Sequence, residues 1–472
     1  MNFCSTSFIF AFLPVLVAVH GVCKGKLRNI VLLAGSIIFY ILVIGGHYEW
    51  LVILAMLTVF NYLVGFAMSG LGLKDKKFAL TVGVVINAGL LLFYKYAQAT
   101  VSLATDLLPD VFSGAIDGQM LNFILPAGLS FYTFKNISYL QQVCTGKVEA
   151  EKSFLNYATY LVNFTQITMG PIQTYKDFRP YLSSREVTLE RITDGLAEFI
   201  IGMGLKVIFA NRLGSVWNGI QTIGYDGIST AFAWLGVVSF SLQLYFDFYG
   251  YTLMATGIGQ MLGYETPKNF NYPYMARSMS EFWRRWHITL GDWFKENVYF
   301  PLGGNRCSKL LNIRNLFIVW MLTGIWHGDN LNFVVWGLFL FILIALEKTK
   351  VLRFITENKV LSHIYLIAMI LISWTIFKIT SLPDLAVFFG RLFPFFGETP
   401  EYVFAQDYVK HLRNVGWIIG VGIVFATPLP RKLYEKVKDK KFITVPVLTT
   451  IFWYAVYCAV CGANDPFLYF NF

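Results

Sequence analysis

Residues 29–46 read NIVLLAGSIIFYILVIGG and contain no charged side chain. A helix rises about 1.5 Å per residue, so this run nearly matches a bilayer's hydrocarbon core, which is about 30 Å thick. The composition agrees: of 472 residues, 56% are hydrophobic and only 14% are charged. A water-soluble fold would lack the polar surface to cover itself. The chain is therefore expected to be a polytopic membrane protein.

Comparable apolar runs recur along the whole chain. They lie near 5–22, 29–46, 50–70, 78–98, 121–142, 195–217, 231–262, 331–348, 362–381, 412–428 and 443–461. Because irregular backbone cannot face lipid, we predict an all-α fold with about 10–12 transmembrane helices plus interfacial or re-entrant helices. No fixed-period repeat or long linker divides the chain, so residues 1–472 are expected to form a single integral-membrane domain.

Lysine and arginine gather in short loops beside these runs, at 24–28, 74–77, 348–350 and 431–441. Such loops stay in the cytoplasm, which predicts a multi-pass protein of the cytoplasmic (inner) membrane with both termini outside. The same loops account for the formal net charge of +10, so nucleic acid is not an expected partner. The six cysteines follow neither a disulfide nor a zinc pattern, and no metal site is expected.

Residues 280–306, SEFWRRWHITLGDWFKENVYFPLGGNR, combine aromatic and charged side chains. On one helix, an apolar arc forms from Trp283, Trp286, Leu290, Trp293 and Phe294, opposite Arg284, Arg285, Asp292, Lys295 and Glu296. This predicts an amphipathic helix at the membrane–water boundary. His287 lies at the edge of the aromatic stripe, where it either faces a channel through the protein or merely packs.

A second histidine lies in MLTGIWHGDNLNFVVWG, residues 321–337. Burial of an ionisable group between apolar runs is costly, so His327 is a functional candidate. A desolvated, neutral imidazole can accept the proton of an alcohol that attacks a carbonyl. The alternative is a hydrogen-bonded core histidine at a helix end. Asp329 is expected to cap the next helix, and Asp247 to orient an imidazole, pair with a basic residue or join two helices.

Several motifs follow one another in a specific order. They are ILPAGLSFYTFKNISYLQQV at 124–143, MGPIQTYKDF at 169–178, SLQLYFDFYGYTLMATGIGQMLGYETPKNFNYPY at 241–274, the segment 280–306, TGIWHG at 323–328 and the closing PFLYFNF. WHG alone is a weak signal, whereas the ordered set is specific. It resembles the membrane-bound O-acyltransferase family, and within it the branch of the alginate O-acetylation proteins.

The resemblance implies helices around a central channel and an enzyme without a bound cofactor. Such an enzyme takes an acyl group, most simply acetyl, from a cytoplasmic thioester. The donor is acetyl-CoA or an acyl-carrier protein, and the group passes across the membrane toward hydroxyls of an extracytoplasmic polysaccharide. In that family the histidine of the WHG element is catalytic, which corresponds to His327. The histidine of RRWH, His287, lines the same route.

The residues themselves suggest how such a route is built. Phosphates of the donor, or an acidic carrier protein, are expected to meet Arg284, Arg285 and Lys295 beside Trp286. Candidate donors to a tetrahedral oxyanion are the Trp326 indole, Asn330 and backbone amides near Gly328. Asp247 is expected along the same channel.

Two departures from the resemblance leave the acyl group and the acceptor open. Leu253 stands where relatives of the alginate type carry an acid, and Lys295-Glu296-Asn297 replaces their RDY. D-alanyl transfer toward teichoic acid is therefore an alternative, as is a saccharide or lipid transporter. The predicted outer segments near 99–120 and 382–411 are too small to bind a polysaccharide alone. An exported or membrane-anchored companion protein is therefore expected as a partner.

Overall fold

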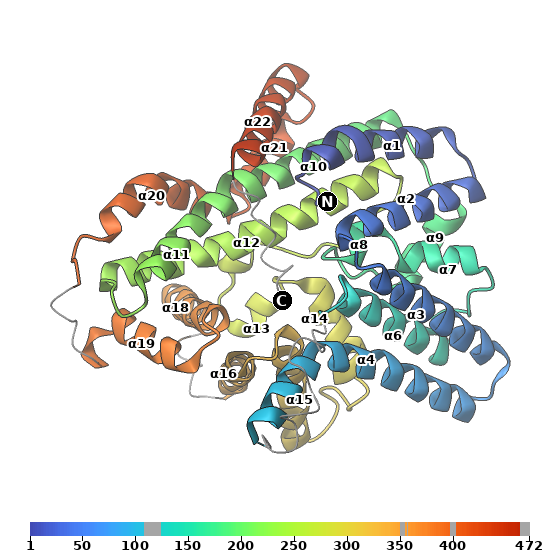
Figure 1. Ribbon diagram of the computed structural model, residues 1–472, viewed down its shortest axis with the longest axis horizontal. Helices are drawn as coiled ribbons and strands as arrows, with labels where there is room; N and C mark the ends of the chain where they lie inside the picture. Colours follow the sequence, from blue (N-terminus) through green and yellow to red (C-terminus); the bar gives the residue numbers. More distant parts are fainter. Residues whose placement is uncertain (108–123, 350–354, 356, 397–402, 463–472) are drawn as a thin grey trace. The chain divides into compact units, whose positions relative to one another are not determined.

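The computed structural model describes residues 1–472 except 108–123, 350–354, 356, 397–402 and 463–472 (Figure 1). Every regular element within that part of the chain is a helix, which confirms the all-α prediction. The closing motif PFLYFNF lies outside the described residues.

The helices follow one another from the N-terminus to the C-terminus. In the first half they are η1 (Phe8–Phe12), α1 (Leu13–Val22), α2 (Lys26–Ile44), α3 (Tyr48–Ala67), η2 (Met68–Gly70), α4 (Leu73–Leu107), α6 (Leu129–Cys144), α7 (Phe154–Leu161), α8 (Phe164–Ile167), α9 (Tyr175–Ser183), α10 (Leu189–Gly204), η3 (Leu205–Ala210) and α11 (Asn211–Ile223). In the second half they are α12 (Thr230–Met261), η4 (Pro273–Met275), α13 (Met279–Trp283), α14 (Ile288–Phe294), η5 (Lys295–Tyr299), α15 (Lys309–His327), α16 (Leu331–Glu347), α18 (Lys359–Lys378), α19 (Leu382–Leu392), η6 (Pro394–Phe396), α20 (Tyr408–Phe425), α21 (Leu429–Val437) and α22 (Lys441–Cys461).

Six of the described helices are long and apolar enough to cross a bilayer. They are Lys26–Ile44, Tyr48–Gly70, Leu73–Val101, Thr230–Met261, Lys359–Lys378 and Lys441–Cys461. The pair α20 and α21 is bent by 73°, and Phe8–Val22 and Leu331–Glu347 are shorter apolar helices. These helices make the chain a multi-pass membrane protein, while the number of 10–12 crossings stays a prediction.

The described chain groups into two compact units. The first comprises Met1–Leu196 and Ala255–Pro267, and the second Ala197–Met254 and Lys268–Phe472. Two of the three boundaries fall inside α10 and α12, and the third lies between Pro267 and Lys268, after the end of α12. Both histidines singled out above belong to the second unit. Whether the units act as one domain stays a prediction.

The amphipathic helix predicted over residues 283–296 is wrong in one respect: the chain forms two short helices there. Helix α13 ends at Trp283 and α14 begins at Ile288. The break centres on His287, whose backbone is left-handed with φ 43° and ψ 53°. Periodicity could not reveal this break because it depends on a distant segment: the amide N–H of Ile288 donates to the carbonyl of Asn269 at 2.9 Å.

Helices α15 and α16 form a closely packed hairpin that carries His327 at its turn. A Cβ on Gly324 would lie 2.4 Å from the carbonyl oxygen of Phe333, and one on Gly337 would lie 2.6 Å from that of Trp320. Only glycine permits backbones to approach so closely, as small residues do between membrane helices. His327, one turn beyond Gly324, is thereby held at the last position of α15.

Candidate active site

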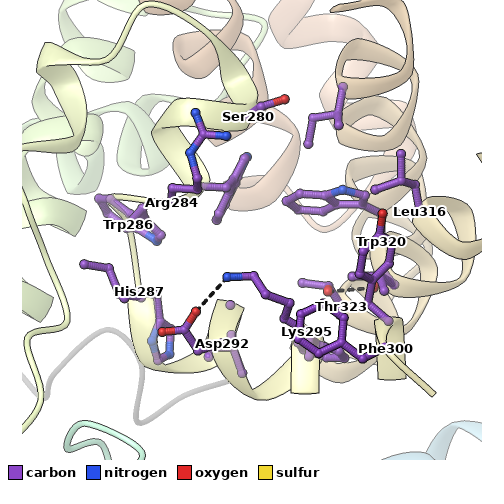
Figure 2. A pocket seen from close by; sticks show the side chains of 18 of the residues that line it. Ser280, Arg284, Trp286, His287, Asp292, Lys295, Phe300, Leu316, Trp320 and Thr323 are labelled. Atoms are coloured by element: carbon purple, nitrogen blue, oxygen red, sulfur yellow. Dashed lines mark hydrogen bonds and ion pairs between the residues drawn. The ribbon is translucent and has the colours of Figure 1, made fainter. Parts of the chain in front are cut away.

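A cavity of about 590 Å³ in the second unit brings the two candidate histidines together. Its wall includes residues of α13 and α14, of the break between them, and of α15 (Figure 2). Aromatic and aliphatic side chains dominate, among them Trp283, Trp286, Leu290, Phe294, Phe300, Leu316, Val319 and Trp320. Trp286 and Trp320 lie on opposite sides of the cavity in Figure 2. The site is a mainly apolar pocket with a few polar groups, as small-molecule sites commonly are.

His327 lies in an aromatic enclosure. Its side chain is 4% exposed, and its ring centroid lies 4.7 Å from Trp326, 4.9 Å from Trp336 and 5.2 Å from Phe377. The following Gly328 leaves room for Phe333, since a Cβ there would lie 2.1 Å from that ring. Packing on several sides fixes the imidazole at the edge of the cavity. The same packing excludes water from the surroundings of His327.

His287 is held by Asn269, a residue that the sequence did not single out. The Oδ1 atom of Asn269 lies 3.0 Å from Nδ1 of His287. The same oxygen accepts from the Thr289 backbone N–H at 3.3 Å and from its hydroxyl at 2.9 Å. Because the Thr289 N–H can only donate, the amide atom facing it is the oxygen, and Nδ1 of His287 must carry the proton.

This tautomer leaves Nε2 of His287 with its lone pair. Nε2 is buried and has no hydrogen-bond partner among the described residues. Burial lowers the pKa of His287 to about 3, so the imidazole is neutral at pH 7. A neutral Nε2 beside the cavity can accept a hydrogen bond from a substrate hydroxyl.

The charged groups of the cavity are mainly cationic. Arg284, Lys295 and Lys348 line it together with a single acid, Asp292. Lys295 pairs with Asp292 at 2.9 Å, drawn as a dashed line in Figure 2. The guanidinium of Arg284 has no carboxylate within ion-pair distance in the described part of the chain. A ligand with phosphate groups would therefore find a favourable potential here.

Glu347 is a second residue that sequence reasoning missed. Its carboxylate accepts from the backbone N–H groups of Met279 and Ser280, at 2.5 and 3.0 Å, and from the Ser280 hydroxyl at 2.8 Å. These bonds tie the last residue of α16 to the start of α13, and so position the segment that carries Trp286 and His287. The only sequence signal was an acid at the end of an apolar run.

Four predicted channel residues do not line the cavity: Arg285, Trp326, Asn330 and Asp247. Arg285 forms an ion pair with Glu281 at 2.6 Å, and Trp326 packs against His327 outside the lining. Asp247 forms a fully buried ion pair with Lys206, one of the arrangements expected for it.

Asn330 lies at the turn between α15 and α16. It is the residue before α16, so the prediction that Asp329 caps this helix is wrong. Asp329 instead accepts from the Asn330 side chain at 3.2 Å. The reason is local: the extended backbone at Gly328 carries the chain one residue further before the helix begins.

Residues 41–382 match the membrane-bound O-acyltransferase family, and the chain belongs to this family. It is 33% identical over 387 residues to the probable alginate O-acetylase AlgI of Pseudomonas aeruginosa, which covers 81% of this chain and 73% of that protein. It is 32% identical over 421 residues to the peptidoglycan O-acetyltransferase of Helicobacter pylori, covering 79% of this chain and 76% of that protein. It is 26% identical over 229 residues to the teichoic acid D-alanyltransferase of Bacillus subtilis, and this match covers 46% of this chain and 58% of that protein.

These relationships confirm the resemblance seen in the motifs. The protein is a membrane-embedded O-acyltransferase, an enzyme that transfers an acyl group to a hydroxyl.

Proposed function

We propose that the enzyme moves an acyl group, most simply acetyl, from a cytoplasmic thioester to a hydroxyl in the cavity that contains His287 and His327. The observation that carries the proposal is the meeting of both imidazoles in one largely apolar pocket with a cationic side. An enzyme of this class requires a group that accepts the proton of the hydroxyl, and the imidazoles of His287 and His327 are two candidates for that general base.

In the proposed reaction His327 is the general base. It takes the proton of the acceptor hydroxyl while the hydroxyl oxygen attacks the thioester carbonyl. The tetrahedral intermediate then collapses, the C–S bond breaks, and the departing thiolate takes the proton from the imidazolium of His327. His287 holds the acceptor hydroxyl through Nε2, because its Nδ1 proton is committed to Asn269. Because the walls of the cavity are mainly apolar, they exclude water and so protect the thioester from hydrolysis.

The donor is proposed to be acetyl-CoA or an acylated carrier protein, and the enzyme itself needs no bound cofactor. Both donors carry a phosphorylated pantetheine arm, which suits the cationic lining formed by Arg284, Lys295 and Lys348. The loops at 24–28, 74–77 and 431–441 are rich in lysine and arginine, which favours their placement on the cytoplasmic side of the membrane. The proposed location is therefore the cytoplasmic membrane, with the donor supplied from inside.

We further propose that a companion protein completes the transfer to the polymer. A polysaccharide strand entering an apolar cavity would lose hydroxyl hydration without gaining partners. A small hydroxyl carrier, such as a serine or tyrosine of an exported or membrane-anchored companion, avoids that loss. The relatives named as alginate and peptidoglycan acetylating enzymes favour an envelope polysaccharide as the final acceptor.

The alternative of D-alanyl transfer rests on two observations: partial similarity to the teichoic acid D-alanyltransferase of B. subtilis, and Leu253 at the position where an acid was expected. Offering the purified enzyme acetyl and D-alanyl thioesters side by side distinguishes the two. A transporter without chemistry would release free thiol from neither.

The central test is thioester turnover by His327→Ala and His287→Ala variants in detergent. Loss of general base assistance should lower the rate of His327→Ala by about 10²–10⁴. His287→Ala should retain more activity and bind the acceptor more weakly. His363→Ala, which changes a half-buried histidine outside the cavity, serves as the control. Wild-type turnover by folded His327→Ala would refute the assignment of the base.

The direction of transfer is tested separately. Single cysteines introduced at positions 25, 75 and 438 should resist an impermeant thiol reagent added to intact cells and react after lysis. Reaction from outside would reverse the orientation. In liposomes with donor inside and polymer outside, polymer acylation should require the companion; complete acylation by this chain alone would refute the relay.

A further inference from the structure

A small polar cavity in the first unit contains two arginines and no acid. It has a volume of about 190 Å³, roughly a third of that of the histidine cavity. It lies where the start of α2 meets the end of α9, two helices that lie near each other in Figure 1. Its lining consists of Gly25, Arg28, Asn29, Tyr181, Leu182, Ser183, Ser184 and Arg185.

Arg185 is a buried cation held only by neutral groups. Arg185 is only 7% exposed. Nε donates to the carbonyl of Tyr181 and Nη2 to Oδ1 of Asn29, both at 2.6 Å. Nη1 lies 3.4 Å from Nε2 of His20. These bonds use three of the five guanidinium N–H groups and leave the positive charge uncompensated.

Arg28 adds a second cation to the same cavity. Its Nε donates to the carbonyl of Cys23 at 2.7 Å, and its Nη1 donates to the carbonyl of Arg185. Burial lowers the pKa of Arg185 to about 10, with smaller opposing effects of Tyr264, which raises it, and Arg28, which lowers it, so Arg185 remains charged at pH 7. In the described part of the chain, no carboxylate lies within ion-pair distance of either arginine.

The helix beside this cavity adds to the positive potential. Helix α2 begins at Lys26 without an acidic residue in its first turn, and its cap, Gly25, offers no side chain. The first turn of α2, which carries a partial positive charge, contributes Arg28 and Asn29 to the lining of the cavity. Like charges placed together in this way repel one another, and an anion between them would remove both the repulsion and the cost of burying Arg185.

We propose that this cavity binds a phosphate group, with Arg28 and Arg185 as its cationic ligands. Guanidinium groups bind phosphate oxygens in pairs, and a cavity this small excludes a complete nucleotide. The phosphate comes either from an anionic lipid headgroup or from free phosphate. The exposed apolar side chains of Val22 and Leu27, next to the cavity along the chain, favour the lipid.

The test measures binding to delipidated protein in a maltoside detergent. Sodium phosphate is compared with sodium chloride at equal ionic strength by thermal shift. Native mass spectrometry then compares phosphatidic acid with diacylglycerol, an otherwise similar lipid without phosphate. Arg28→Gln removes one cationic ligand. Arg185→Lys keeps the buried charge but loses the bidentate hydrogen bonding that a guanidinium group offers a phosphate. Lys24→Gln is the matched control, because it removes an exposed cation four residues from Arg28 that does not line the cavity.

We expect wild type and Lys24→Gln to bind phosphatidic acid equally. Arg28→Gln should bind at least about tenfold more weakly, because one charge-assisted hydrogen bond is lost. Arg185→Lys should also weaken binding while the protein still elutes as a folded particle. Stabilisation by inorganic phosphate would identify free phosphate as a sufficient ligand, whereas retention of phosphatidic acid alone would identify the lipid. Equal binding by wild type and Arg28→Gln, or no binding of either probe, would overturn the proposal.

Discussion

Asn269→Ala should separate the role of the His287 contact from general stability. The variant removes the oxygen that accepts from Thr289 N–H, from the Thr289 hydroxyl and from His287 Nδ1–H. The hydroxyl can rotate toward another acceptor and the imidazole can turn or exchange tautomers, but the backbone N–H of Thr289 cannot move. The loss of the acceptor for one buried donor costs about 1–3 kcal/mol, so the variant should lower the free energy of unfolding by about that amount.

The effect on catalysis has a separate cause. Without Asn269 the imidazole of His287 is free to exchange tautomers and to turn, so Nε2 no longer presents its lone pair to the cavity. We expect turnover per folded molecule to fall at least about tenfold. The assay is release of free thiol from an acetyl thioester, normalised to the folded fraction measured by size-exclusion chromatography.

Asn87→Ala is the matched control. Asn87 is as buried as Asn269, and its amide exchanges hydrogen bonds with Asn61 and Asn136 in the first unit. It should destabilise the protein to a similar degree and leave turnover per folded molecule unchanged. Asn269→Asp, which keeps the accepting oxygen, should recover part of the stability. Equal turnover per folded molecule in Asn269→Ala and Asn87→Ala would refute the positioning role of Asn269.

Three further outcomes are expected from the described contacts. Arg284→Gln should raise KM for the thioester donor about three- to tenfold with little change in kcat, since it removes a cavity-lining cation that is proposed to bind the donor phosphates, whereas Arg285→Gln should not; equal KM values for both variants would contradict the proposed role of the cationic lining. Asp247→Ala should destabilise the protein by about 3–5 kcal/mol in thermal or denaturant unfolding, because the buried Lys206 loses its carboxylate partner, and the added change Lys206→Met should restore much of that loss; no recovery would show that the ion pair is not the cause. Gly324→Leu should prevent the α15–α16 hairpin from forming, since even its Cβ overlaps the carbonyl of Phe333; a monodisperse, active variant would refute that packing.

Apolar length predicted the helices well. The run predicted at 443–461 lies inside α22, Lys441–Cys461, and the run at 50–70 corresponds to the span Tyr48–Gly70. These predictions succeeded because a helix in lipid must satisfy its own backbone, so the length of an apolar run alone indicates a helix. The sequence also singled out the two histidines, His287 and His327, that line the candidate active-site cavity.

The geometry of the site was less accessible. The helical period of residues 283–296 does not reveal that the helix breaks before Ile288, where the backbone N–H donates to the carbonyl of Asn269 instead of to the preceding turn. Asn269 and Glu347 are short polar residues without a local pattern, and only tertiary contacts show what they hold. Arg284 and Arg285 are neighbours in sequence, yet one lines the cavity and the other pairs with Glu281.

The left-handed backbone at His287 carries a cost that a stability screen would be expected to relieve. A side chain in that conformation costs about 1–3 kcal/mol, and glycine adopts it without strain. Glycine would, however, also delete a buried imidazole together with its hydrogen bond to Asn269 and its packing against Phe248, a loss of about 2–5 kcal/mol. Packing and chemistry therefore favour the same residue, and thermostabilising changes have to be sought away from position 287.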